Sequence, residues 1–123
     1  MADMATRKTR KGQRMRAAGA SGTAAAGRRE RLGEALDHLA PRLPRFEREA
    51  IIDHALDSPG LSVAAPGNAA WLAMVAYIRH VFTDYDALLA EGFDQDAARF
   101  FVIDEINDYL AEWGASRQVE GGE

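Results

Sequence analysis

The segment WLAMVAYIRHVFTDYDALL, residues 71–89, decides the fold class of this chain. At the helical rotation of about 100° per residue, its apolar side chains gather in an arc of about 140°. These side chains are Trp71, Met74, Val75, Ile78, Val81, Phe82, Tyr85, Leu88 and Leu89. The arc does not break at Thr83 and Asp84. The pattern therefore predicts one long helix from Pro66 or Asn68 to about Glu91, which Gly92 ends in a left-handed conformation.

The same helical period predicts three further helices. The first covers residues 28–40 and ends at Pro41, and the second runs from Pro44 to about Asp57. The fourth begins at the N-cap Asp94 and ends at Gly114. Its apolar stripe contains Phe100, Ile103, Ile106, Leu110 and Trp113. We predict an all-α fold, a small bundle of about four helices around a long central third helix.

The N-terminal part of the chain differs sharply in composition from the rest. Residues 1–27 contain no aromatic residue, Leu, Ile or Val, so they cannot bury enough apolar surface to offset chain entropy. We predict a disordered basic arm at 1–27, a helical domain at 28–114 and a disordered tail at 115–123.

Charge divides along the same boundary. Residues 1–31 carry nine basic and two acidic residues, a net charge of +7, whereas the rest of the chain carries six basic and seventeen acidic residues, a net charge of −11. Six cations and no acid lie within residues 7–16, namely Arg7, Lys8, Arg10, Lys11, Arg14 and Arg16. Such runs bind nucleic-acid phosphates without reading sequence. The arm is therefore a candidate nucleic-acid tether, and a solubilising tail is the alternative.

Composition also excludes several kinds of protein. The chain has no cysteine, which removes disulfides, thiolate catalysis and cysteine-ligated zinc. It has no P-loop and no dinucleotide-binding glycine motif. No apolar run approaches the roughly 20 residues of a membrane span, and no apolar segment of a signal peptide follows the basic N-terminus. We expect a cytoplasmic protein that needs no cofactor and does not enter a membrane.

A candidate site lies on the predicted third helix, opposite its apolar arc. Arg79, Thr83 and Asp86 follow one another at i, i+4 and i+7, with His80 beside them and Asp84 one turn further on. Small residues surround these polar groups, a pattern typical of close approach by another helix or a ligand. One interpretation is a structural network in which Arg99 of the fourth helix pairs with Asp86. The other is an open site for an anionic ligand.

A metal site is a further interpretation of His80 and Asp84. Residues at i and i+4 on a helix can supply two ligands, but catalytic zinc needs three protein ligands. Nothing in the sequence places His54 near His80. We therefore predict no metal.

Residues 71–114 resemble the DUF2293 family, a group of small proteins of unassigned function. The resemblance rests on Ile78-Arg79-His80, Thr83, Tyr85-Asp86, Leu88-Leu89, Gly92, Arg99 and Trp113. Residues 43–70 match weakly, and the arm does not match. The family brings no established activity. The resemblance implies that Arg79, His80, Thr83, Asp86 and Arg99 belong to one unit.

Three classes of function are compatible with these features. We favour a non-enzymatic binding module, whose arm binds nucleic acid and whose helical body contacts a protein partner. The first alternative is an enzyme with a site at Arg79, His80, Thr83 and Asp86. The second is a structural or regulatory protein that forms a homodimer through the small-residue face of the third helix.

Overall fold

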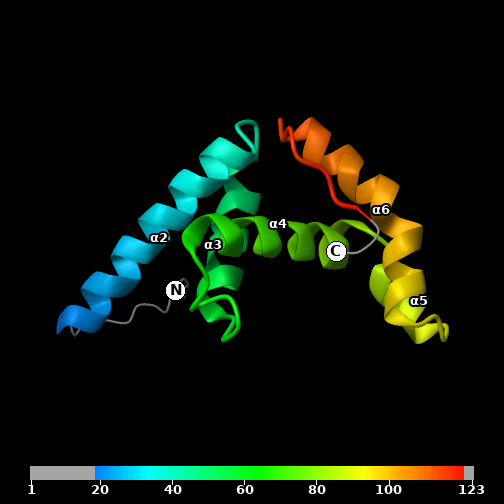
Figure 1. The fold of residues 1–123 in the computed structure, drawn as a ribbon, viewed down its shortest axis with the longest axis horizontal. Helices are drawn as coiled ribbons and strands as arrows, with labels where there is room; N and C mark the ends of the chain where they lie inside the picture. Colours follow the sequence, from blue (N-terminus) through cyan, green and yellow to red (C-terminus); the bar gives the residue numbers. More distant parts are fainter. Residues whose placement is uncertain (1–18, 121–123) are drawn as a thin grey trace, which may run out of the picture. The chain divides into compact units, whose positions relative to one another are not determined.

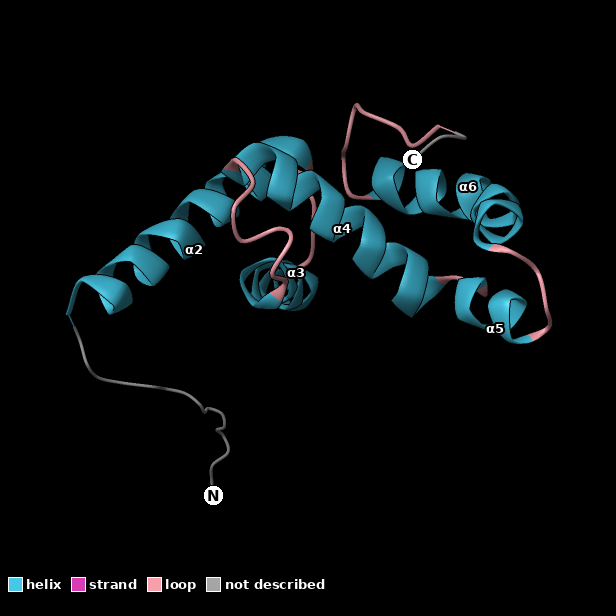
Figure 2. Ribbon diagram, turned by 60° about the horizontal axis from the view of Figure 1, so that its bottom comes forward, coloured by secondary structure: helices cyan, strands magenta, loops and turns pink. Residues whose placement is uncertain are grey.

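The structure is a computed structural model that describes residues 19–120, and these residues form helices without strands (Figures 1 and 2). The chain divides into two units, Met1–Glu30 and Arg31–Glu123. The helices are α2 (Gly19–Leu39), α3 (Arg45–Asp57), α4 (Pro66–Phe82), α5 (Tyr85–Ala90) and α6 (Gln95–Glu112). The predicted all-α class is confirmed, with five helices in the described range rather than about four.

Most helix ends fall where the sequence predicts them, because a local signal sets each one. Pro44 precedes α3 and Pro66 occupies the first turn of α4, where no partner is lost with the missing N–H. Asp94 caps α6 by accepting a hydrogen bond from the backbone N–H of Ala97 at 2.8 Å. Gly92 and Gly114 adopt positive φ angles of 106° and 87°.

The first helix, α2, is longer than predicted. Its backbone is helical from Gly19, whereas the sequence pattern places its start at residue 28. Alanine favours helix, and residues 24–26 are three consecutive alanines, so this segment needs no apolar face to continue the helix. The predicted disorder of residues 1–27 is therefore not seen at 19–27. Residues 1–18, including the six cations of the arm, lie outside the described residues, and their disorder stays a prediction.

The long third helix is the main error of the sequence prediction. The segment forms two helices, because Thr83 adopts an extended conformation with φ −125° and ψ 172° between α4 and α5. The hydroxyl of Thr83 donates to the carbonyl of Arg79 and accepts from the backbone N–H of Tyr85 at 3.2 Å. These two bonds satisfy groups that the broken helix leaves open.

The core of the second unit is built around α4. This helix packs against α3, α5 and α6, and it supplies Trp71, Met74 and Ile78 at 0–2% exposure. From the neighbouring helices, Leu32, Leu36, Ile51, Ile52, Val102, Ile106 and Leu110 are buried with them. Val81 departs from the predicted arc, because 54% of its surface is exposed.

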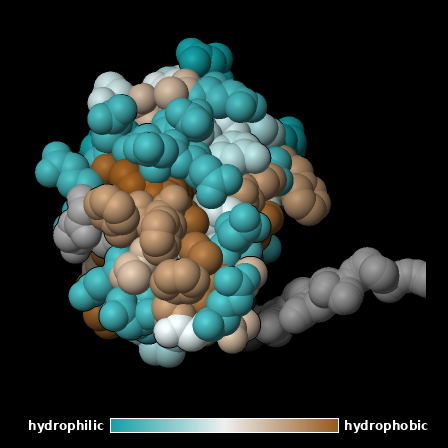
Figure 3. All heavy atoms as spheres, turned by 90° about the vertical axis from the view of Figure 1, so that its right-hand side faces the viewer, coloured by the Kyte–Doolittle hydropathy of each residue, from teal (hydrophilic) through white to brown (hydrophobic). Residues whose placement is uncertain are grey.

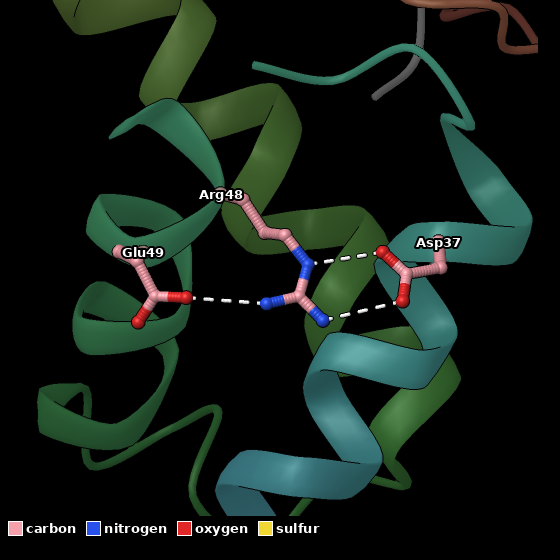
Figure 4. Close-up of polar contacts among 3 residues, drawn as sticks. All are labelled: Asp37, Arg48 and Glu49. Carbon is pink, nitrogen blue, oxygen red and sulfur yellow. Dashed lines mark hydrogen bonds and ion pairs between the residues drawn. The ribbon is translucent and has the colours of Figure 1, made fainter. Parts of the chain in front are cut away.

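An ion pair joins α2 to α3 (Figure 4). The guanidinium of Arg48 donates to both carboxylate oxygens of Asp37, at 2.9 and 3.2 Å, and to Glu49 at 3.1 Å. The bond to Asp37 raises the pKa of Arg48. A side chain at Gly33 would place its Cβ 2.5 Å from a guanidinium nitrogen of Arg48, so glycine leaves room for this pair.

A second arginine, Arg42, connects the loop after α2 to the C-terminal end of α6. The side chain of Arg42 donates to the carbonyls of Ala111 at 3.1 Å and Glu112 at 3.3 Å, and its backbone N–H donates to Trp113 at 2.8 Å. A cation there also complements the negative end of the helix dipole.

The predicted disordered tail is wrong for residues 115–120. Val119 is 4% exposed, and the side chain of Asn107 pairs with both of its backbone polar groups, at 2.8 and 3.1 Å. The guanidinium of Arg117 stacks over the ring of Trp71 at 4.1 Å. A cation over an aromatic face and a paired, buried valine hold this segment against the helices. Residues 121–123 lie outside the described residues.

Candidate functional site

The break at Thr83 determines how the predicted polar site is arranged. Tyr85, the first residue of α5, is 3% exposed, and its ring contacts two side chains of α4. The ring of His80 meets its ring edge-on, with centroids 5.4 Å apart, and the guanidinium of Arg79 lies 5.5 Å from its centroid. Tyr85 is thus the centre on which the polar residues are positioned, although sequence analysis treats it only as part of the apolar arc.

His80 pairs with Asp86, and this contradicts the predicted Asp86–Arg99 pair. The Nδ1 atom of His80 lies 2.9 and 3.1 Å from the two carboxylate oxygens of Asp86. The two side chains are 49% and 62% exposed. A carboxylate that orients an imidazole is an element of general-base sites, so this pair is the feature that an enzyme would use. Because both side chains are about half exposed, this contact contributes little to stability.

Arg79 is the buried charge of the site. Only 9% of its surface is exposed, and its Nε atom has no hydrogen-bond partner among the described residues. Burial lowers its pKa, and the charge of Arg99 lowers that pKa further. The ring of Tyr85 is a favourable contact, because an aromatic face attracts a cation.

Arg99 reaches the same region from α6, and its Nε atom also lacks a partner among the described residues. Thr83 links the end of α4 to the start of α5 through its hydrogen bonds to Arg79 and Tyr85. Asp84 is exposed and makes no capping hydrogen bond at the start of α5. Within the range 19–120, no group of three or more histidine, aspartate and glutamate side chains gathers into a metal-binding arrangement.

A second candidate site, which sequence analysis missed, is an exposed group of aromatic side chains. We define the phenylalanine surface as Phe93, Phe100 and Phe101, which are 40%, 70% and 57% exposed. Phe101 contacts Phe93 and Phe100 edge-on, at centroid distances of 5.4 and 6.3 Å. The view onto the α5 and α6 side shows an apolar patch framed by hydrophilic residues (Figure 3). The signal was the pair Phe100-Phe101, because adjacent helical residues point about 100° apart and a narrow buried face leaves one of them toward solvent.

Acidic side chains surround the phenylalanine surface along α6. Asp104 lies one turn beyond Phe100 and Phe101, and Asp96 lies one turn before Phe100. The exposed acids of this region are Asp94, Asp96, Asp104, Glu105, Asp108 and Glu112. Arg99 is the single basic residue between Asp94 and Glu112. The surface is therefore apolar at its centre and negative around it.

Comparison with known proteins places the chain in a family. Residues 35–114 match the model of the DUF2293 family, which is described as an uncharacterized conserved protein. The match covers more than half of the chain, so the chain belongs to this family, and the resemblance seen in the sequence is confirmed. The comparison matched no curated protein and no solved structure. None of the described helices is long and apolar enough to cross a membrane.

Proposed function

We propose that this member of the DUF2293 family is a non-enzymatic binding module, with a helical body that binds a protein partner and a basic arm that binds nucleic acid. The phenylalanine surface carries the first half of the proposal. Phe93, Phe100 and Phe101 expose 40%, 70% and 57% of their surfaces, and Phe101 contacts the other two. Groups of exposed aromatic side chains are typical of binding surfaces.

The chemistry around the phenylalanine surface defines the kind of partner. Its acidic rim repels acidic proteins and attracts basic ones. A helix with leucine-type side chains on one face and lysines beside them would bury the phenyl rings and pair with Asp96 and Asp104. The body is therefore a receptor for a basic amphipathic segment.

A synthetic amphipathic helix of leucine and lysine tests this assignment. We expect Phe100→Gln to weaken its binding to the protein by about tenfold or more, because an exposed ring at the centre of an interface contributes at least 1–2 kcal/mol. Phe46→Gln is the matched control, since Phe46 is a helical phenylalanine on α3 with 77% exposure. Isothermal titration calorimetry compares the variants. Equal affinities for all three proteins would reject the phenylalanine surface as the binding site.

The charge division of the chain carries the second half of the proposal. The net charge of −11 beyond residue 31 disfavours nucleic acid at the body, so binding must use the cations of residues 7–16. Neutralising about six phosphates gives a contact that is strongly sensitive to salt and indifferent to sequence.

Deletion of residues 1–16 tests the arm. We expect the full chain to bind a single-stranded oligonucleotide with an affinity that falls by about three hundredfold between 50 and 200 mM salt. The shortened chain should bind too weakly to detect, with an unchanged melting temperature. Fluorescence anisotropy and thermal melts supply the two measurements. If the shortened chain bound the oligonucleotide as tightly as the full chain, the helical body would be the binding site and the tether hypothesis would be wrong.

A further inference from the structure

Two arginines of the second unit lie near enough to one another for the charge of Arg99 to lower the pKa of Arg79. Arg79 lies in the last turn of α4, and Arg99 lies on α6, which packs against α4. Among residues 19–120 neither guanidinium forms an ion pair or a hydrogen bond, and the Nε atoms of both are buried without a partner. Arg79 is buried and Arg99 is partly buried. Buried polar atoms are normally paired, so the two Nε atoms require an explanation.

The pairing within the site makes this arrangement more unusual. Asp86 is the carboxylate that the sequence offers to Arg99, yet both of its oxygens are directed to Nδ1 of His80. The face of Tyr85 supports Arg79 from one side, but an aromatic ring leaves the N–H groups of a guanidinium without acceptors.

Folding does not benefit from this arrangement. Two like charges held close together repel one another, and burial removes water from their donors. The lowered pKa of Arg79 reflects both effects, burial first and Arg99 second. Groups that a fold positions at its own expense are typical of binding sites, where a ligand supplies the missing partner.

We propose that Arg79 and Arg99 bind an oxyanion of the phosphate class between α4 and α6. Guanidinium groups match phosphate oxygens in geometry, because each offers parallel N–H donors in a plane, and two cations balance the charge of a phosphate. The site uses no residue of the arm or of the phenylalanine surface, and it goes beyond the function proposed above.

Inorganic phosphate is the probe for this site. At constant ionic strength, set with sodium chloride, we expect phosphate to raise the melting temperature of the full chain and to shift the Nε–H resonances of Arg79 and Arg99 in ¹H–¹⁵N spectra. Arg99→Gln should weaken phosphate binding by about tenfold or more, since it removes a charge-assisted contact. Arg45→Gln is the matched control, because it removes an exposed arginine of α3 and should leave the affinity unchanged.

Two further measurements make the test decisive. Without phosphate, Arg99→Gln should melt at the same temperature as the wild type or higher, because it relieves repulsion. Arg79→Lys keeps the charge but loses the planar donors, and it should also bind phosphate more weakly. The proposal is overturned if chloride stabilises the protein as much as phosphate does, if Arg45→Gln loses as much affinity as Arg99→Gln, or if neither Nε–H resonance moves.

The source of the phosphate group follows from a competition experiment. The chain without residues 1–16 is loaded with inorganic phosphate, and a single-stranded oligonucleotide is added. Displacement of phosphate from the Arg79 and Arg99 resonances would identify a phosphodiester as the ligand. Retention of phosphate would identify a free phosphate or a phosphate monoester.

Discussion

Replacing Tyr85 by alanine should lower the free energy of unfolding by about 3–5 kcal/mol, the range for truncating a buried aromatic side chain. Tyr85 is 3% exposed, and its ring contacts His80 and Arg79. The helix that it begins has only six residues, too few to be stable without tertiary packing. Loss of the ring therefore removes both a core contact and the anchor of α5. Chemical denaturation of the wild type and the variant measures the loss.

Tyr85→Phe is the matched control, because it keeps the ring and both of its contacts. We expect it to lose less than about 1 kcal/mol. In the Tyr85→Ala protein, amide hydrogen exchange should accelerate most in residues 85–90. A loss below about 1 kcal/mol for Tyr85→Ala, or uniform protection of α5, would show that this helix does not depend on the tyrosine.

The sequence predicts helix class and helix ends because these depend on local chemistry. Proline before α3, aspartate before α6 and glycine after α5 each act within one turn of their own position. The sequence of one chain is therefore enough to locate these helix ends. Burial is predicted almost as well, since Trp71, Met74 and Ile78 occupy one helical face and are all buried.

The break at Thr83 escapes the same reasoning for a physical reason. Tyr85 is buried in the structure, and it would also lie on the apolar arc of a continuous helix. The spacing of apolar residues therefore does not distinguish the broken helix from a continuous one. The pairing of His80 with Asp86 depends on the break. Residues six apart on a straight helix point about 120° away from one another and lie about 9 Å apart along the axis. The predicted partner of Asp86 was therefore wrong.

The phenylalanine surface and the arginine pair were hidden for a different reason. An apolar residue and a charged residue each have a usual environment, and pattern reading assigns Phe100 to the core and Arg99 to an ion pair. The structure places Phe100 at 70% exposure and buries the Nε atom of Arg99 without a hydrogen-bond partner in the described part of the chain. Departures from usual environments are visible only once the neighbouring helices are in place, and they are where function is expected.

Replacing Arg79 by methionine should raise the free energy of unfolding by about 1–3 kcal/mol, the cost of leaving a buried polar group unsatisfied. Methionine retains most of the length of the side chain, favours helix and carries no charge to desolvate. The variant also relieves the repulsion from Arg99 that lowers the pKa of Arg79. The lost contact with Tyr85 offsets part of the gain. Denaturation in phosphate-free buffer provides the measurement.

Arg42→Met is the control with the opposite expected sign. The side chain of Arg42 donates to two carbonyls at the C-terminal end of α6, so its removal should destabilise the protein by about 1 kcal/mol. Phosphate should reduce the difference in the free energy of unfolding between Arg79→Met and the wild type, because only the wild type retains both cations that would bind the anion. If Arg79→Met destabilised the protein as Arg42→Met does, Arg79 would be a structural residue, and its burial would need no ligand to explain it.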